Sequence, residues 1–170
     1  MFPSRSSLMT GKYPARNNCT DWISGHKKPF AKMKIPQWTQ YMAQEEVTIA
    51  EVLKNAGYKT IHIGKWHLGE DEKYWPENQG FDKNIGGWSV GAPQKRGDGN
   101  GYFPPYLNPR LSDGPEGEYL TERLSKEAID FLEANKNGES PFFMNSIYTI
   151  NEGIIGSSIV YIEHNINGES

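Results

Sequence analysis

Residues 47–69, VTIAEVLKNAGYKTIHIGKWHLG, constrain the fold more than any other part of this 170-residue chain. Thr48 and Glu51 have the spacing of a capping box, so a helix is predicted to begin here. A glycine after the last periodic residue commonly ends a helix, and Gly57 is expected to end this one. Its predicted apolar face consists of four side chains, Ile49, Val52, Leu53 and Ala56.

A short strand is predicted directly after this helix. Residues 59–63 alternate in polarity and place Ile61 and Ile63 on one side, which is the period of a strand. His62 falls between them and is expected either at the surface or as a strand residue with its hydrogen bonds satisfied. Gly64 ends the strand and opens a loop that extends to Gly69.

The remaining segments extend this pattern of alternating helices and strands. Residues 19–44 show no periodicity, residues 80–115 are rich in Gly, Pro and Asn, and the composition of residues 94–106, QKRGDGNGYFPPY, predicts a loop. Residues 118–135 have helical spacing, and residues 141–148, PFFMNSIY, are typical of a buried strand. The predicted helix carries apolar side chains at Leu120, Leu124, Ala128, Ile129 and Leu132. The alternation predicts an α/β fold with a partly parallel sheet.

Lys65 and His67 lie in the loop that follows the predicted strand 59–63. In open α/β sheets, sites form where loops leave the carboxyl ends of strands. Lysine supplies a fixed positive charge for an anion, and histidine exchanges protons near neutral pH. A candidate anion site is therefore placed in this loop, although a solvent-facing loop without function would show the same spacing.

The opening run MFPSRSSLMTGKYPAR is a second candidate for anion binding. Pro3 suits the first turn of a helix, and Ser4 can satisfy free amides there. Arg5 would add a bidentate fork that suits a tetrahedral oxyanion. An ordinary helix start with an exposed arginine remains the alternative.

Charge and composition exclude several classes of partner. The net charge is −3, and no basic cluster has the size of a nucleic-acid footprint, so no nucleic-acid partner is expected. No stretch is long and apolar enough to span a membrane, and the first residues lack the apolar region of a signal peptide. The chain has one cysteine, Cys19, so no internal disulfide is possible.

Two motifs together resemble those of the formylglycine-dependent sulfatases of the alkaline-phosphatase-like superfamily. PSRSSLMTG near the start matches the first family signature, and GYKTIHIGKWHLG, residues 57–69, looks like the second. QGFD, residues 79–82, is a further landmark, and the resemblance covers residues 1–148, whereas residues 149–170 form a divergent tail. The first signature is matched at Pro3, Ser4, Arg5, Leu8, Thr10 and Gly11. The resemblance implies a partial alkaline-phosphatase-like fold, with an incomplete mixed sheet flanked by helices.

The resemblance also implies a role for each candidate residue. Arg5 would lie beside the formylglycine and the metal, Lys65 would contact the sulfate, and His67 would hydrogen-bond the formylglycine hydrate. Met1 stands where the family has the Cys or Ser that becomes formylglycine, and Asn151 stands near the position of a leaving-group histidine. Methionine offers only a thioether, so the chain as printed is expected to be inactive. The family uses calcium, and its ligands are expected to be missing from this chain.

The function implied is that of a fragment of a sulfuric ester hydrolase acting on sulfate esters of carbohydrates. Its partner would be a sulfated small molecule or glycan, and the full-length protein would be periplasmic or extracellular. A phosphonate or phosphodiester hydrolase of the same superfamily, and a non-catalytic module that binds sulfated glycans, remain alternatives. If the sheet is incomplete, strands 59–63 and 141–147 should expose unpaired edges, unless residues 159–162 form a strand of undefined register.

Overall fold

The computed structural model describes residues 2–23, 30–93 and 101–148, together with the backbone of residues 158–163. The helices are α1 (Phe2–Thr10), α2 (Ile49–Asn55) and α3 (Leu120–Asn135), with short 3₁₀ turns at Glu72–Tyr74 and Pro76–Asn78. The strands are β1 (Lys59–Gly64), β2 (Lys83–Ile85), β3 (Phe142–Ile147) and β4 (Ser158–Glu163). The predicted helices and strands are thus all present, and α3 begins two residues later than expected.

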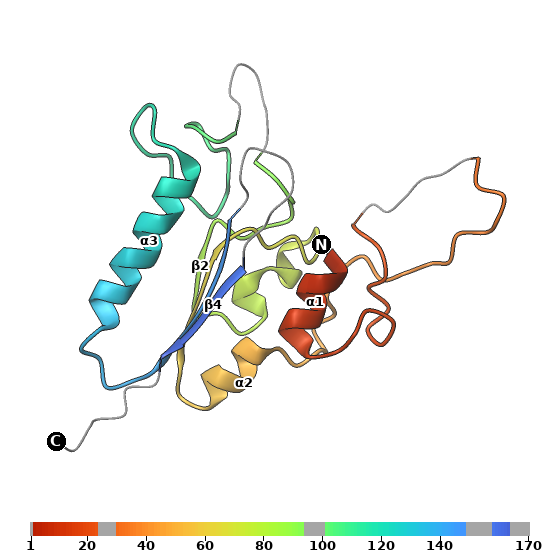
Figure 1. Ribbon diagram of the computed structural model, residues 1–170, viewed down its shortest axis with the longest axis horizontal. Helices are drawn as coiled ribbons and strands as arrows, with labels where there is room; N and C mark the ends of the chain where they lie inside the picture. Colours follow the sequence, from red (N-terminus) through yellow and green to blue (C-terminus); the bar gives the residue numbers. More distant parts are fainter. Residues whose placement is uncertain (1, 24–29, 94–100, 149–157, 164–170) are drawn as a thin grey trace.

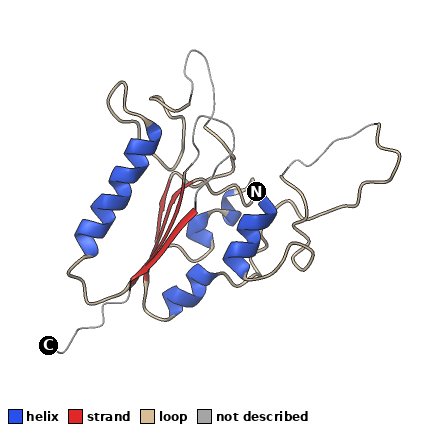
Figure 2. Ribbon diagram, viewed as in Figure 1, coloured by secondary structure: helices blue, strands red, loops and turns tan. Residues whose placement is uncertain are grey.

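The four strands form a mixed sheet in the order β2-β1-β3-β4. β1 pairs in parallel with both β2 and β3, whereas β4 runs antiparallel to β3. Figure 1 shows α3 on one face of the sheet and α1 and α2 on the other. Figure 2 shows the same layers coloured by secondary structure. The predicted α/β class, a mixed sheet flanked by helices, is confirmed.

The strand pairing goes beyond what the sequence pattern indicates. The sequence pattern predicts no strand within residues 80–115, but residues 83–85 form β2 because their backbone pairs with β1 from Ile61↔Lys83 to Ile63↔Ile85. Unpaired edges were expected on the strands at 59–63 and 141–147 unless residues 159–162 formed a strand, and in the structure β1 lies between β2 and β3 while β4 pairs with β3. The tail segment does form a strand, and its register places Ile159 opposite Ser146.

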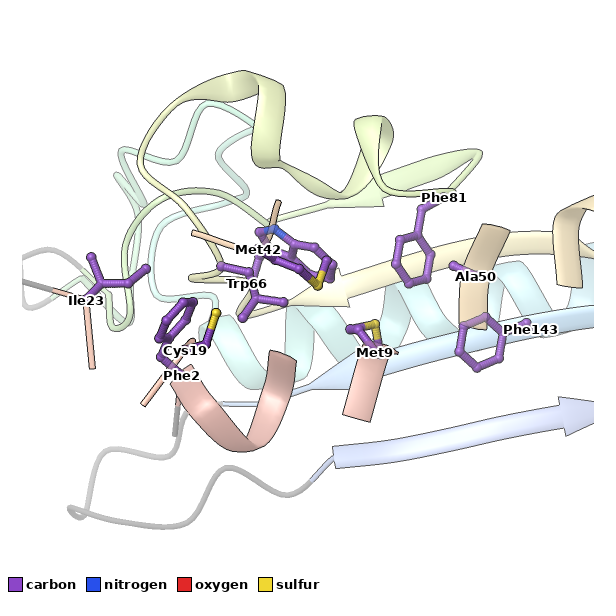
Figure 3. Close-up of a cluster of buried hydrophobic side chains, with 10 residues drawn as sticks. Phe2, Met9, Cys19, Ile23, Met42, Ala50, Trp66, Phe81 and Phe143 are labelled. Carbon is purple, nitrogen blue, oxygen red and sulfur yellow. The ribbon is translucent and has the colours of Figure 1, made fainter. Parts of the chain in front are cut away.

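The two layers of the core meet the sheet on opposite faces. On the α1 and α2 face, Phe143 of β3 packs with aromatic, aliphatic and sulfur-containing side chains from the helices and loops (Figure 3). The members of this cluster are Phe2, Met9, Cys19, Ile23, Met42, Ala50, Trp66, Leu68, Phe81 and Phe143. On the other face, Ile61 and Ile63 of β1 pack with residues of α3, including Leu124 and Phe131. Both faces of β1 are therefore buried.

The helices bury narrower faces than the sequence pattern predicts. In α2, Ala50 is fully buried, whereas Val52 is 54% exposed, and Ala56, directly after the helix, is also exposed. In α3, Ile129 is 57% exposed, and Phe131 is buried instead, with its ring edge against Phe142. Each helix contacts the sheet through one flank, so apolar residues at the margin of the predicted face lie in solvent.

The predicted capping box at the start of α2 is present, and it also joins the helix to the loop before β2. The Thr48 hydroxyl accepts from the Glu51 amide at 3.1 Å and donates to the Gln79 carbonyl at 2.9 Å. A Thr48→Ala variant removes both bonds and is expected to lower the free energy of unfolding by roughly 1–2 kcal/mol. Urea denaturation measures this loss, and Thr48→Ser, which keeps the hydroxyl, is the control. Equal stabilities of the Ala and Ser variants would contradict it.

Candidate functional site

The candidate site lies where the three parallel strands end at the same edge of the sheet. β1 occupies a central position, and its carboxyl end continues directly into the loop of residues 64–69. The loop that follows β2 and the residues that follow β3 leave the sheet at this edge too. Side chains from segments that are distant in the sequence can therefore meet here, as is usual for sites in open α/β sheets.

Gly64 holds the loop tightly against the end of β3. Its φ is +89°, and a Cβ added there would lie 2.1 Å from the Ile147 carbonyl oxygen. The same carbonyl accepts a hydrogen bond of 2.9 Å from the Lys65 amide. Only glycine combines this backbone angle with so close an approach, so the start of the loop is fixed in position by the sheet.

His67 is held by the loop that follows β2. Its φ is +54°, in the left-handed region that non-glycine residues seldom occupy. Its amide donates to the Trp88 carbonyl at 3.0 Å, and a Cβ added at Gly91 would lie 2.4 Å from its Nδ1 atom. Because strained backbone of this kind concentrates at functional sites, the geometry makes His67 a stronger candidate than its spacing alone did.

Arg5 reaches the same region from α1. Pro3 lies in the first turn of that helix, as predicted, and Ser4 follows it within the helix. The Arg5 side chain is only 8% exposed, so the alternative of an exposed arginine was wrong. Burial lowers the pKa of its guanidinium to about 10, which still leaves Arg5 charged at neutral pH.

The electrostatics show that Arg5, Lys65 and His67 share one environment. Burial, and then the charge of Arg5, lower the pKa of Lys65 to about 8. Burial, followed by the charges of Arg5 and Lys65, lowers the pKa of His67 to about 4. Near neutral pH the site therefore holds two cations and a neutral imidazole. This arrangement can bind an anion, and its imidazole can accept a proton from a neighbouring hydroxyl.

A cavity of about 50 Å³ adjoins the loop on the side facing α3. It is lined by Gly64 and Lys65 together with mainly apolar residues, among them Trp88, Tyr106, Leu124 and Ile147. Lys65 therefore belongs to the charged site with Arg5 and also lines this mainly apolar cavity.

His62 was the residue that the sequence left ambiguous, and the structure places it in the core. Its side chain is fully buried, and its ring contacts the edges or faces of Trp66 and Phe81 at centroid distances of 5.0 and 5.5 Å. Its Nε2 lies 3.2 Å from the Gly64 carbonyl oxygen. Of the two expectations for His62, the satisfied strand residue is confirmed and the surface position is wrong.

Met1 and Asn151 lie outside the described residues. Within the described part of the chain, no three His, Cys, Asp or Glu side chains are grouped as metal ligands would be. The described residues therefore do not fit a calcium site. Among the same residues, no helix combines the length and apolar character needed to cross a bilayer.

The family profile described as Sulfatase matches residues 2–149. The chain belongs to the sulfatase family. Among curated relatives, it is 34% identical over 162 residues to the arylsulfatase of Hemicentrotus pulcherrimus, 34% identical over 125 residues to human arylsulfatase G, and 29% identical over 163 residues to mouse N-acetylgalactosamine-6-sulfatase. These alignments cover 84%, 74% and 84% of the chain, but only 27%, 21% and 29% of the respective relatives.

Solved structures support the same fold. The crystal structure of Ps i-CgsB in complex with k-i-k-neocarrahexaose matches with a TM-score of 0.59 and 25% identity, covering 85% of this chain and 33% of that one. Ps i-CgsB alone matches with a TM-score of 0.62 and 22% identity, covering 90% of this chain and 35% of that one. The fold is therefore that of a sulfatase, and this chain covers 33% and 35% of the two neighbours' chains.

Proposed function

We propose that this chain forms the sulfate-binding part of a sulfuric ester hydrolase that acts on sulfated carbohydrates. The convergence of Arg5, Lys65 and His67 at the carboxyl edge of the sheet carries the proposal. The charges of Arg5 and Lys65 hold the sulfuryl oxygens and neutralise charge that develops on them. His67, neutral at physiological pH, accepts the proton of a hydroxyl at the reacting centre.

The carbohydrate substrate is proposed from the family and from what its relatives' names state. The curated relatives include an N-acetylgalactosamine-6-sulfatase, and one structural neighbour was solved with a neocarrahexaose. The sulfatase-like part is proposed to end at residue 148, with residues 149–170 as a divergent tail. The whole protein is proposed to act in the periplasm or outside the cell.

The chain as printed is proposed to bind sulfate esters without turning them over. Met1 occupies the position at which the family resemblance places the formylglycine precursor. A thioether has no hydroxyl with which to attack sulfur. Loss of the nucleophile from a covalent mechanism can reduce turnover by about 10⁶-fold. An aryl sulfate should therefore bind and remain intact, and release of the phenol by this chain would contradict the proposed role of Met1.

Sulfate binding should weaken as the pH rises through the pKa of Lys65. That pKa is about 8, so the ammonium is charged near pH 7 and neutral well above pH 8. Inorganic sulfate remains a dianion throughout, so titration calorimetry should show about a tenfold loss of affinity between about pH 7 and about pH 9.5. A Lys65→Gln variant should bind weakly at both pH values.

Lys136→Gln is the matched control, because Lys136 follows the end of α3 and pairs with Glu133 on the protein surface. It should retain the affinity and the pH dependence of the original chain. Binding that changes with neither pH nor the Lys65 substitution would contradict the proposal. Stronger binding of an aryl phosphonate than of the matched aryl sulfate would favour the phosphonate hydrolase, and the desulfated form of a sulfated oligosaccharide should not bind.

A further inference from the structure

His62 lies beneath the candidate site in a buried polar network. The Asn145 amide nitrogen lies 3.0 Å from His62 Nδ1, and the Gly64 carbonyl oxygen lies 3.2 Å from Nε2. His62 and Asn145 are both fully buried, on adjacent strands β1 and β3. Buried polar groups without partners are costly, so the two ring nitrogens have a structural reason to be satisfied here.

The partners of the ring fix its tautomer. The Gly64 carbonyl can only accept a hydrogen bond, so Nε2 must carry the proton. Nδ1 of the neutral ring is then an acceptor, and it receives the Asn145 amide. Burial holds the pKa of His62 down at about 3, the backbone groups of Gly64 and Lys65 raise it, and the charge of Arg5 lowers it. The ring is therefore neutral across the physiological range.

The hydrogen bond from His62 ends on the peptide group that precedes Lys65. The Gly64 carbonyl and the Lys65 amide belong to the same planar peptide unit. His62 binds the oxygen of this unit, and the Ile147 carbonyl binds its nitrogen at 2.9 Å. A peptide plane held at both ends cannot rotate without breaking a buried hydrogen bond, and its orientation determines where the Lys65 side chain begins.

We propose that His62 is a positioning residue that fixes the Gly64–Lys65 peptide plane and thereby holds the Lys65 ammonium beside Arg5. The value of this position for sulfate binding rests on the proposed function. The geometry itself does not, since it depends only on the contacts among His62, Asn145, Gly64 and Ile147. Asn145 has a supporting role, because its amide N–H donates to Nδ1, which favours the tautomer with the proton on Nε2.

The tautomer can be tested on the unmodified 170-residue chain by NMR with ¹⁵N-labelled histidine. We expect the His62 ring to carry its proton on Nε2 at neutral pH, with Nδ1 unprotonated. A ring protonated on Nδ1 would overturn the proposal, since Nε2 could then no longer donate to Gly64. This measurement requires no variant and no sulfate binding.

Two variants then test whether the bond positions Lys65. In His62→Gln, the longer amide side chain can place an N–H near the position of Nε2, whereas in His62→Asn the shorter amide reaches only the region of Nδ1. We expect the Asn variant to speed hydrogen exchange of the Lys65 amide by about tenfold or more relative to the Met144 amide of β3. It should also raise the pKa of Lys65 from about 8 toward its ordinary value, because the ammonium leaves its buried position. The Gln variant should resemble the original chain in both measurements.

A merely structural role gives a different pattern. If His62 only fills the core, the Asn variant should speed exchange at Lys65 and Met144 equally and the Gln variant should rescue neither, which would overturn the proposal. A binding measurement with inorganic sulfate distinguishes failure of the proposed function from failure of the proposed role of His62. If the original chain fails to bind sulfate, the proposed function fails, while the exchange rates and the Lys65 pKa still decide the role of His62.

Discussion

A Gly64→Ala variant is expected to lose about 4 kcal/mol or more of its free energy of unfolding, because two independent penalties coincide at this position. The added Cβ would lie 2.1 Å from the Ile147 carbonyl oxygen, in the backbone of β3. The residue must also keep a φ of +89°, which costs a residue with a Cβ about 1–2 kcal/mol. Relief of the overlap requires β1 and β3 to separate where the Lys65 amide bonds to Ile147. Urea denaturation of the variant measures the total loss.

Gly57 provides a matched control for the backbone penalty. Its φ is +90°, nearly the same as that of Gly64, but a Cβ added there has no heavy atom within 4 Å. Gly57→Ala should therefore cost only about 1–2 kcal/mol. The difference between the two variants isolates the contact with Ile147, and equal losses would show that β3 does not approach Gly64 as closely as the structure places it.

The local elements of this fold were predictable because their signals are local. The capping box at Thr48 and the alternation through Ile61 and Ile63 specify α2 and β1 from neighbouring residues alone. β2 was not predictable, because its three residues carry no apolar alternation and become a strand only through pairing with β1. The same holds for the exposed Val52, whose position depends on how α2 packs against the sheet.

The candidate site likewise has features that the sequence predicts and features that it does not. Lys65 and His67 could be selected from the sequence because they follow a strand and a glycine. The burial of Arg5 and the depressed pKa of His67 arise from packing between α1, the loop after β1 and the loop after β2. These contacts join distant parts of the chain, so the spacing of residues in the sequence does not predict them. For His62, the alternation showed a residue between two core isoleucines but not the partner on β3. Asn145, a polar residue within the apolar run PFFMNSIY, was the one available signal for such a partner.

His62 should also make the protein unstable in acid. Its pKa in the folded protein is about 3, mainly because burial opposes the charged ring, whereas in the unfolded chain it returns to its ordinary value of 6.5. Between these values the unfolded chain binds a proton that the folded protein does not. The free energy of unfolding must therefore decrease as the pH falls below about 6.5. His67, with a pKa of about 4 and partial exposure, adds a smaller decrease of the same sign.

The contribution of His62 should amount to about 3 kcal/mol between about pH 6.5 and about pH 4, at 1.36 kcal/mol for each pH unit. Urea denaturation across this range measures it, and His62→Gln isolates it because glutamine does not titrate while His67 and the carboxylates remain. We expect the stability curve of the Gln variant to be flatter and to approach or cross that of the original chain as the pH falls. Parallel curves would mean that His62 takes up its proton equally in both states, which a fully buried ring bonded to Gly64 and Asn145 does not allow.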